Sequence, residues 1–105
     1  MKKLFFILLM LPLYVSAAEN EYIIVIQNHQ FQPREIIVPA AKKIKLLIEN
    51  KDATPEEFES YSLNREKIIG ANSAIKIYLG PLAPGRYPFF GEFNKATAQG
   101  VIIAQ

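Results

Sequence analysis

The feature that most constrains this chain is a series of short segments rich in β-branched and aromatic residues, each bounded by Pro, Gly, Asn or Asp. In the clearest segment, Lys43 to Glu49, Ile44, Leu46 and Ile48 alternate with charged residues, so that one face meets a core and the other meets water. No long helical period interrupts the series. The pattern predicts a single all-β sandwich. The other expected strands are 22–26, 31–38, 74–79, 86–90 and 100–104.

The N-terminus has the layout of a secretory signal peptide. Two lysines precede an unbroken apolar run from Leu4 to Leu11, and small residues follow at 16–18. An apolar core of roughly a dozen residues is shorter than the about 20 that a membrane-spanning helix needs. We therefore expect a signal peptide at 1–18, export to the periplasm, and a domain at 19–105 with no membrane span after cleavage. Both Ala17 and Ala18 offer a cleavage point.

Charge and cysteine content exclude two classes of function. The chain has twelve basic and ten acidic residues, and Lys2 and Lys3 of the leader account for the difference. Because the remaining domain is close to neutral and has no basic stripe, nucleic acid is not an expected partner. The chain has no cysteine, so it forms no disulfide and supplies no thiolate.

The turn before the 86–90 segment carries a structural signature. Pro84 and Gly85 favour a tight turn, and Tyr87 follows at the start of the next strand. This spacing is typical of a tyrosine corner, in which the phenol bonds back to the backbone near a Greek-key crossover. We expect Tyr87 to be structural.

Three stretches, "FQPREIIVPA", "IENKDATPEEF" and "LAPGRYPFFGEFN", resemble cupredoxin segments, and the resemblance covers the whole of the expected domain. It implies a Greek-key β-sandwich of cupredoxin type with about seven strands. More narrowly, "NHQFQP", "TPEEFES" and "GRYPFFGEFNKATAQG" resemble EfeO-type cupredoxin-like proteins, which are small periplasmic domains associated with iron or copper uptake.

At the positions of the copper ligands, this sequence departs from the cupredoxin pattern. A blue copper centre uses two imidazoles and a thiolate with a weak axial thioether. By the resemblance, Glu56 stands at the first His, Gly91 at the Cys and Asn94 at the second His, while the Met position falls at Ala98 or Gln99. A type 1 copper site is therefore chemically excluded.

The order of the strands predicts where a different metal site lies. In an up-and-down succession, the connections after the first and third strands emerge at the same end as the loop after the aromatic strand. His29, Glu56, Glu57, Glu92 and Asn94 lie in these connections. Such an end suits a copper or iron ion of harder character, such as Cu(II), Fe(II) or Fe(III), or else Mn(II). Glu59 and Glu66 are further candidate ligands.

Four of the candidates also have a structural interpretation. Residues 54–57 have the spacing of a capping box, so Glu57 is alternatively a helix cap. Glu56 and Glu59 are alternatively solvated loop charges, and His29 is alternatively a surface turn residue. Asn94 is a poor ligand for transition metals.

These observations favour a periplasmic accessory protein that binds or relays a copper or iron ion in a metal-uptake or homeostasis system. Its expected partners are a membrane permease or a redox protein. The alternative is a metal-free interaction module of the cell envelope, which docks through the aromatic loop around Phe90 and Phe93. We expect no enzyme activity, because the chain has no nucleophile elbow, P-loop or dinucleotide motif.

Overall fold

The computed structural model describes residues 20–105, and the predicted leader at 1–18 lies outside the described residues. Within 20–105 the regular structure consists of nine strands and one short 3-10 helix. This part of the chain contains no helix that is long and apolar enough to cross a bilayer. The elements are β1 (Glu21–Gln27), β2 (Gln30–Gln32), β3 (Glu35–Val38), β4 (Ile44–Asn50), β5 (Glu56–Ser60), β6 (Arg65–Ile69), β7 (Ala74–Leu79), β8 (Gly85–Gly91), η3 (Glu92–Asn94) and β9 (Gln99–Ala104).

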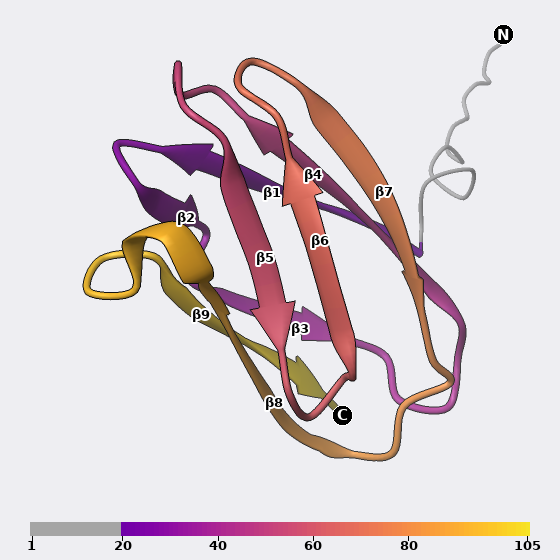
Figure 1. Cartoon of the computed structure of the whole chain (residues 1–105). Coiled ribbons are helices and arrows are strands. Elements are labelled where there is room, and N and C mark those ends of the chain that lie inside the picture. The colour runs from indigo at the N-terminus through magenta and orange to yellow at the C-terminus, as the bar shows by residue number, and fades with distance from the viewer. Residues whose placement is uncertain (1–19) are drawn as a thin grey trace, which may run out of the picture.

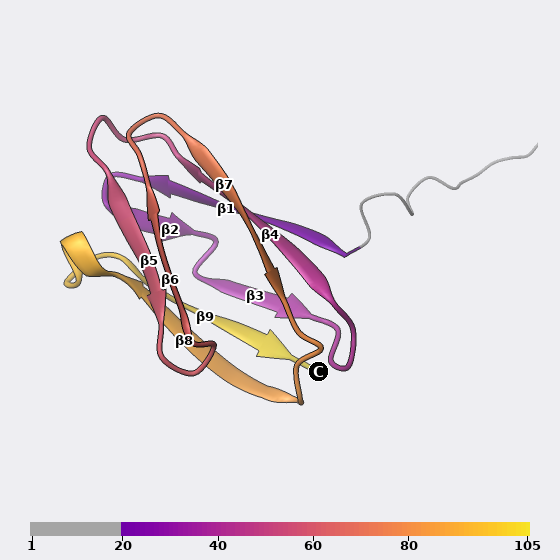
Figure 2. The same ribbon diagram turned by 45° about the vertical axis from the view of Figure 1, so that its right-hand side comes forward.

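The strands form two sheets, with the orders β2-β1-β4-β7 and β3-β9-β8-β5-β6. The pairs β1–β4 and β3–β9 are parallel, and the other pairs are antiparallel. Figure 1 shows the β5–β6 hairpin in front of the sheet that contains β1, β4 and β7, and Figure 2 shows the same two layers after a turn of 45°. The predicted all-β Greek-key sandwich is confirmed.

The core fills the space between the two sheets. Ile44, Leu46 and Ile48 of β4 are buried, whereas the residues between them are partly exposed, as the alternation predicts. The rings of Phe31, Phe58 and Phe89 contact one another in this core, with centroid separations of 5.0–6.2 Å. Because β5 contributes Phe58 to this cluster, packing fixes the strand that also carries the acidic candidates.

The predicted tyrosine corner is confirmed. The Tyr87 hydroxyl donates a hydrogen bond of 2.7 Å to the carbonyl of Ala83, four residues earlier. This bond ties the start of β8 to the turn that enters it.

The expected strand at 31–38 is wrong as a single element. It is divided into β2 and β3, which belong to different sheets. The division falls at Pro33 and Arg34, which form a bend. Since proline has no N–H to donate to a ladder, the chain leaves one sheet there and enters the other.

The hairpin of β5 and β6 was not predicted. Together with the division of 31–38, it explains why the six expected segments correspond to nine strands and not to about seven. The capping-box interpretation of residues 54–57 is wrong, because a strand begins at Glu56 and no helix follows. Three glutamates in five residues hide the alternation, in which Phe58 and Ser60 face inward.

Candidate functional site

The predicted convergence of three connections at one end of the sandwich is confirmed for the backbone. Because β1 and β4 are parallel, the connections that follow them leave at the same end. Asn28 and His29 form the turn after β1, and their N–H groups donate to the Asp52 carboxylate at 2.8 and 2.9 Å. The Thr97 hydroxyl, in the loop after η3, donates to the His29 carbonyl at 2.6 Å.

A buried amide holds the loop that leads to β5. The side chain of Asn50 is 2 % exposed and donates to the carbonyls of Thr54, Ile69 and Gly70 at 2.9–3.2 Å. Its oxygen accepts the Asp52 N–H at 2.9 Å. These bonds fix the place at which β5 begins, and with it the position of the Glu56 side chain.

Glu56 lies in the sandwich interior, where its carboxylate accepts three hydrogen bonds. It is 1 % exposed. One carboxylate oxygen accepts the N–H groups of Glu57 and Phe93, both at 2.9 Å, and the other accepts the Asn94 side-chain amide at 2.7 Å. The expectation that Glu56 is a solvated loop charge is wrong. Since the donors satisfy the buried carboxylate, they offset the cost of removing it from water.

The absence of a side chain at Gly91 makes room for this carboxylate. A Cβ atom built on Gly91 would lie 2.7 Å from Cδ of Glu56 and 2.7 Å from Cβ of Ala98. Gly91 also donates its N–H to the Ala98 carbonyl at 2.8 Å. The positions that the resemblance assigns to copper ligands therefore meet, but a carboxylate and an amide occupy them. Without a thiolate, this set does not fit a type 1 centre.

A second group of carboxylates lies on the outward face of the β5–β6 hairpin. Glu57, Glu59 and Glu66 each place one oxygen within 4.8 Å of the others. Glu59 is directly opposite Glu66 across the hairpin. We call these three residues the carboxylate cluster. Like charges placed directly opposite each other repel, so the cluster needs a proton or a cation to offset this repulsion.

The pKa values of two members reflect this crowding. The pKa of Glu57 rises from 4.5 to about 7, chiefly through a hydrogen bond with the Glu66 carboxyl and then through burial and the neighbouring negative charges. The pKa of Glu59 is also raised, chiefly by burial and then by the charges of Glu66 and Glu92. Burial and the crowding of negative charge therefore favour a proton on the Glu57 carboxyl.

The candidate ligands therefore divide among three places. Glu57 and Glu59 belong to the carboxylate cluster. Glu92 is not a member of that group, and its Oε1 lies 3.6 Å from Lys95 Nζ. Glu56 and Asn94 pair with each other in the interior. The His29 imidazole faces Asp52, with Nδ1 3.5 Å from Oδ2. Among the described residues, His29 is not part of a close group of three ligands.

The sequence placed Glu66 among the additional candidates and missed Asp52. Glu66 becomes a neighbour of Glu59 only through the β5–β6 hairpin, whose turn contains Asn64 with φ of 56°. Asp52 lies between Lys51 and Ala53 in a segment that reads as an ordinary loop. The aspartate pairs with the Asn28–His29 turn only because β1 and β4 run parallel.

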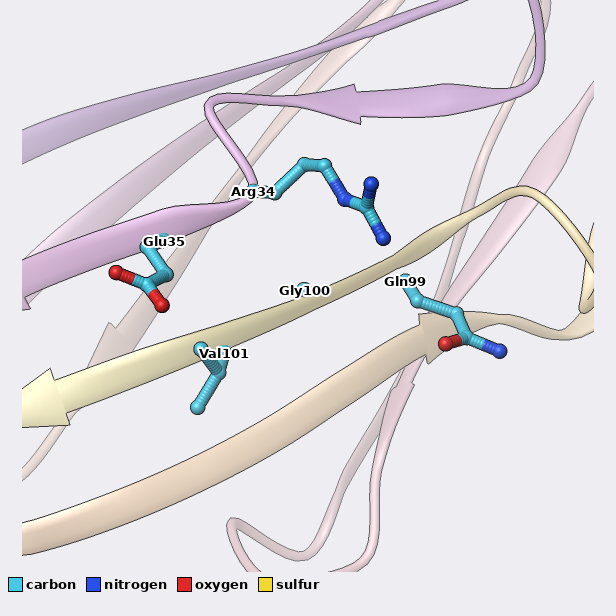
Figure 3. A pocket seen from close by; sticks show the side chains of 5 residues that line it. All are labelled: Arg34, Glu35, Gln99, Gly100 and Val101. Carbon is cyan, nitrogen blue, oxygen red and sulfur yellow. The ribbon is translucent and has the colours of Figure 1, made fainter.

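A hollow of about 440 Å³ lies elsewhere, over the pairing of β3 with β9. Figure 3 shows the Arg34 side chain extending from the start of β3 toward β9, with the Glu35 side chain pointing in a different direction. Gln99, Gly100 and Val101 complete the lining. The hollow shares no residue with the carboxylate cluster.

Sequence comparison gives a family match over nearly the whole chain. The model of the cupredoxin-like domain family matches residues 3–104. An uncharacterized protein of Rickettsia prowazekii (strain Madrid E) is 44 % identical over 107 residues, which cover 95 % of this chain and 86 % of that protein.

Solved structures resemble the fold. Reduced auracyanin from Roseiflexus castenholzii has a TM-score of 0.68 at 16 % identity, covering 82 % of this chain and 97 % of auracyanin. The Cu(I)-containing metal-binding domain of the Cu(I)-exporting ATPase CopA from Streptococcus pneumoniae has a TM-score of 0.72 at 15 % identity, covering 81 % and 84 %. At these identities the similarity concerns the fold alone.

Proposed function

Because this chain belongs to the cupredoxin-like domain family, we propose that it is an exported accessory protein of a metal-uptake or metal-homeostasis system. In this proposal the protein works in the periplasm and binds a copper or iron ion for a membrane permease or a redox partner. The ion is held by the carboxylate cluster of Glu57, Glu59 and Glu66, away from the position of a type 1 copper.

One observation carries the proposal, namely the environment of the Glu57 carboxyl. The residue is only 8 % exposed. Glu59 and Glu66 each place a carboxylate oxygen within 4.8 Å of a Glu57 oxygen, and the pKa of Glu57 is raised to about 7, chiefly by Glu66 and by burial. A buried carboxylate is normally paired with a cation or with N–H donors. Glu57 instead faces other carboxyl groups, which is an arrangement that a bound cation stabilises.

The donor set favours particular ions. Carboxylate oxygens suit hard or borderline cations, so Cu(II), Fe(II), Fe(III) and Mn(II) fit the cluster better than Cu(I). The family context supports a metal-related role, since one structural neighbour is a domain that contains Cu(I). The EfeO-type resemblance supports iron or copper uptake as the setting.

Titration of the purified protein with Cu(II), Mn(II) and, without oxygen, Fe(II) tests this proposal at pH 7.5. An ion that binds only the folded state raises the free energy of unfolding, by about 2.7 kcal/mol when its free concentration is 100 times Kd. We expect Glu57→Gln and Glu66→Gln to remove this stabilisation. The matched control is Glu49→Gln, because Glu49 lies on β4 in the other sheet. If none of the ions raises the melting temperature of the unaltered protein, the metal proposal is wrong.

A second candidate is a metal-free interaction module, and the environment of Glu56 favours it. The interior position is filled by the protein's own carboxylate and amide. The adjacent Phe93 is 49 % exposed, whereas the Phe90 ring is contacted by Tyr61 and by Lys95. In this alternative, Phe93 docks onto a partner protein. If the protein is such a module, we expect it to be folded and expect none of the ions to raise its melting temperature.

A further inference from the structure

The side of the five-stranded sheet that faces away from the core has an apolar centre. Because side chains alternate along a strand, the residues between the buried positions point outward. From β3 to β8 most of these outward residues are apolar, and they are Ile37, Val101, Ile103, Pro88 and Phe90. We call this surface, together with the outward residues of β5 and β6, the outer face.

Several side chains of the outer face are strongly exposed. Ile37 on β3, Ile68 on β6 and Tyr61 in the turn between β5 and β6 are 56 %, 61 % and 76 % exposed. They are three of the six large hydrophobic residues that are exposed within residues 20–105. The Tyr61 ring belongs to this face because it contacts the Phe90 ring, with a centroid distance of 5.4 Å. Hydrophobic side chains gathered on one face mark a surface for a binding partner.

Charge divides the outer face into an acidic half and a mainly basic half. The outward residues of β5 and β6 are glutamates and one isoleucine, namely Glu57, Glu59, Glu66 and Ile68. The half formed by β3, β9 and β8 carries basic residues on or beside its strands, namely Arg34, Arg86 and Lys95, together with Glu35. The outer face therefore carries both of the charges that it needs to bind a copy of itself.

Arg34, at the edge of the basic half, has no acidic partner in the described part of the chain. The ion pairs formed within residues 20–105 do not include it. The neighbouring Glu35 side chain points in a different direction, as Figure 3 shows. The arginine is exposed and lines the hollow of about 440 Å³ over β3 and β9. A guanidinium in this position can bind a carboxylate of another molecule through two parallel N–H donors.

Strand pairing places Arg34 and the carboxylates at the same height on opposite edges of the sheet. One row of paired residues runs from Gln99 on β9 through β8 to Glu59 on β5 and Glu66 on β6. Because β3 runs parallel to β9, Arg34 is level with Gly100, one residue from the start of this row. The offset along the strands is therefore about 3.3 Å, which the length of an arginine side chain spans.

We propose that the outer face binds the outer face of a second copy of this chain. A two-fold axis that runs along the strands between the two faces reverses the strand order, so β3 of one copy lies over β6 of the other. Arg34 then meets Glu59 and Glu66 of the second copy. Because such an interface is symmetric, the same contact forms twice. The apolar centres of the two faces cover each other.

The charges favour a second copy over an unrelated partner. Glu59 and Glu66 are directly opposite each other on the hairpin, so within one copy they repel. A guanidinium from the second copy offsets this repulsion, and the carboxylates in turn pair with an arginine that has no partner of its own. Contacts between the apolar centres supply affinity, while the charged edges fix the orientation. The inference goes beyond the proposed function and needs no ion.

Sedimentation equilibrium at pH 7.5, with a chelator present, tests the proposal. We expect the unaltered protein to have the mass of two chains when concentrated and of one chain when diluted. Arg34→Glu and Glu66→Arg should each weaken self-association by at least about 10-fold, because each places like charges opposite one another twice. Lys76→Glu is the matched control, since Lys76 is exposed on β7 of the other sheet, and it should leave the association unchanged.

A mixture of the two charge variants gives the sharpest result. In an equimolar mixture of Arg34→Glu and Glu66→Arg, each chain carries the charge that the other needs at both contacts. The mixture should therefore recover the mass of two chains, although each variant alone does not. Recovery also shows that both variants are folded.

The apolar centre has its own matched pair of substitutions. Ile37→Gln should weaken self-association by about 10-fold, because it removes a hydrophobic side chain from the interface twice. The control is Ile23→Gln, since Ile23 is 50 % exposed but lies on β1 of the other sheet. Equal effects of the two substitutions would contradict the assignment of the interface to the outer face.

Two results would overturn the proposal. If the unaltered protein stays monomeric at about 1 mM, a second copy is not the partner of the outer face. If the unaltered protein dimerises but the mixture of charge variants stays monomeric, Arg34 does not meet the carboxylates of the second copy. Since the chelator excludes metal ions, neither result bears on the proposed ion site, which is tested by the metal titration alone.

Discussion

Glu56 and Glu57 are consecutive on β5, and they show two different fates for a buried carboxyl group. They are 1 % and 8 % exposed, and they face opposite sides of the same sheet. Glu56 points inward and accepts hydrogen bonds from three N–H donors. Glu57 points outward into a group of other carboxyls.

The difference shows that the groups surrounding a buried carboxylate, and not its burial alone, determine its role. A carboxylate with enough N–H donors joins two parts of the backbone and needs no further ligand. A carboxylate that faces other carboxylates is stabilised by a proton or a cation. The interior site is thus a structural connection between β5 and η3, while the outer cluster is where we propose that an ion binds.

The largest effect is expected at Glu56. Glu56→Ala leaves three N–H donors without their acceptor near the interior, which should lower the free energy of unfolding by about 3 kcal/mol. Urea denaturation at pH 8 measures this change. Glu57→Ala under the same conditions should not lower stability, because it removes a repulsive charge. If both variants were equally destabilised, the contrast between the two glutamates would be lost.

A substitution at Gly91 should have the next largest effect. Gly91→Ala places a methyl group against the Glu56 carboxylate and Ala98, so we expect a loss of about 1–3 kcal/mol from overpacking. Gly70→Ala is the matched control, since the closest neighbour of its added Cβ is Ser73 Oγ at 3.5 Å. The control should stay within about 0.5 kcal/mol of the unaltered protein. If Gly91→Ala did not lower the free energy of unfolding, there would be free space between Gly91 and the Glu56 carboxylate.

A smaller effect is expected in the pH dependence of stability. Because folding raises the pKa of Glu57 from 4.5 to about 7, the folded state binds more protons than the unfolded state between these values. Stability should therefore fall as the pH rises from about 4.5 to about 7. Thermal melts across this range, with a chelator present, should show a weaker decline for Glu57→Gln and a higher melting temperature than the unaltered protein at pH 8. Identical pH profiles would contradict the proton sharing in the cluster.

The smallest effect is expected at His29. The imidazole pairs with Asp52 at the surface, so His29→Ala should change stability by about 0.5 kcal/mol or less. Because the cluster does not include His29, the affinity for Cu(II) should stay within about twofold of the unaltered value, a change well below 1.4 kcal/mol. A tenfold loss of Cu(II) affinity, measured by calorimetric titration, would show that the His29 imidazole is a ligand of the ion.

Much of the fold was accessible from local patterns in the sequence. The alternation in β4 and β7 predicted these strands to within a residue of their ends, because apolar residues at every second position have one way to reach a core. The hairpin of β5 and β6 escaped prediction, because its outward positions carry glutamates that suit a loop equally well.

The candidate site was accessible in part. The resemblance identified Glu56, Gly91 and Asn94 as equivalent positions, and the structure brings them together. The inward direction of Glu56 and the outward direction of Glu57 depended on where β5 begins. A shift of one residue in a strand turns every side chain to the other face, so an unrecognised strand leaves both directions open.

The sequence by itself determined that the protein is an all-β sandwich and that no thiolate holds a metal, because periodicity and residue type are properties of the chain. Only the tertiary structure decided which glutamates meet one another and which meet N–H donors. Residues far apart in the sequence, such as Glu56 and Asn94 or Glu59 and Glu66, become neighbours through strand pairing and loop closure. The charge and hydrogen-bonding state of a carboxylate follows from those neighbours.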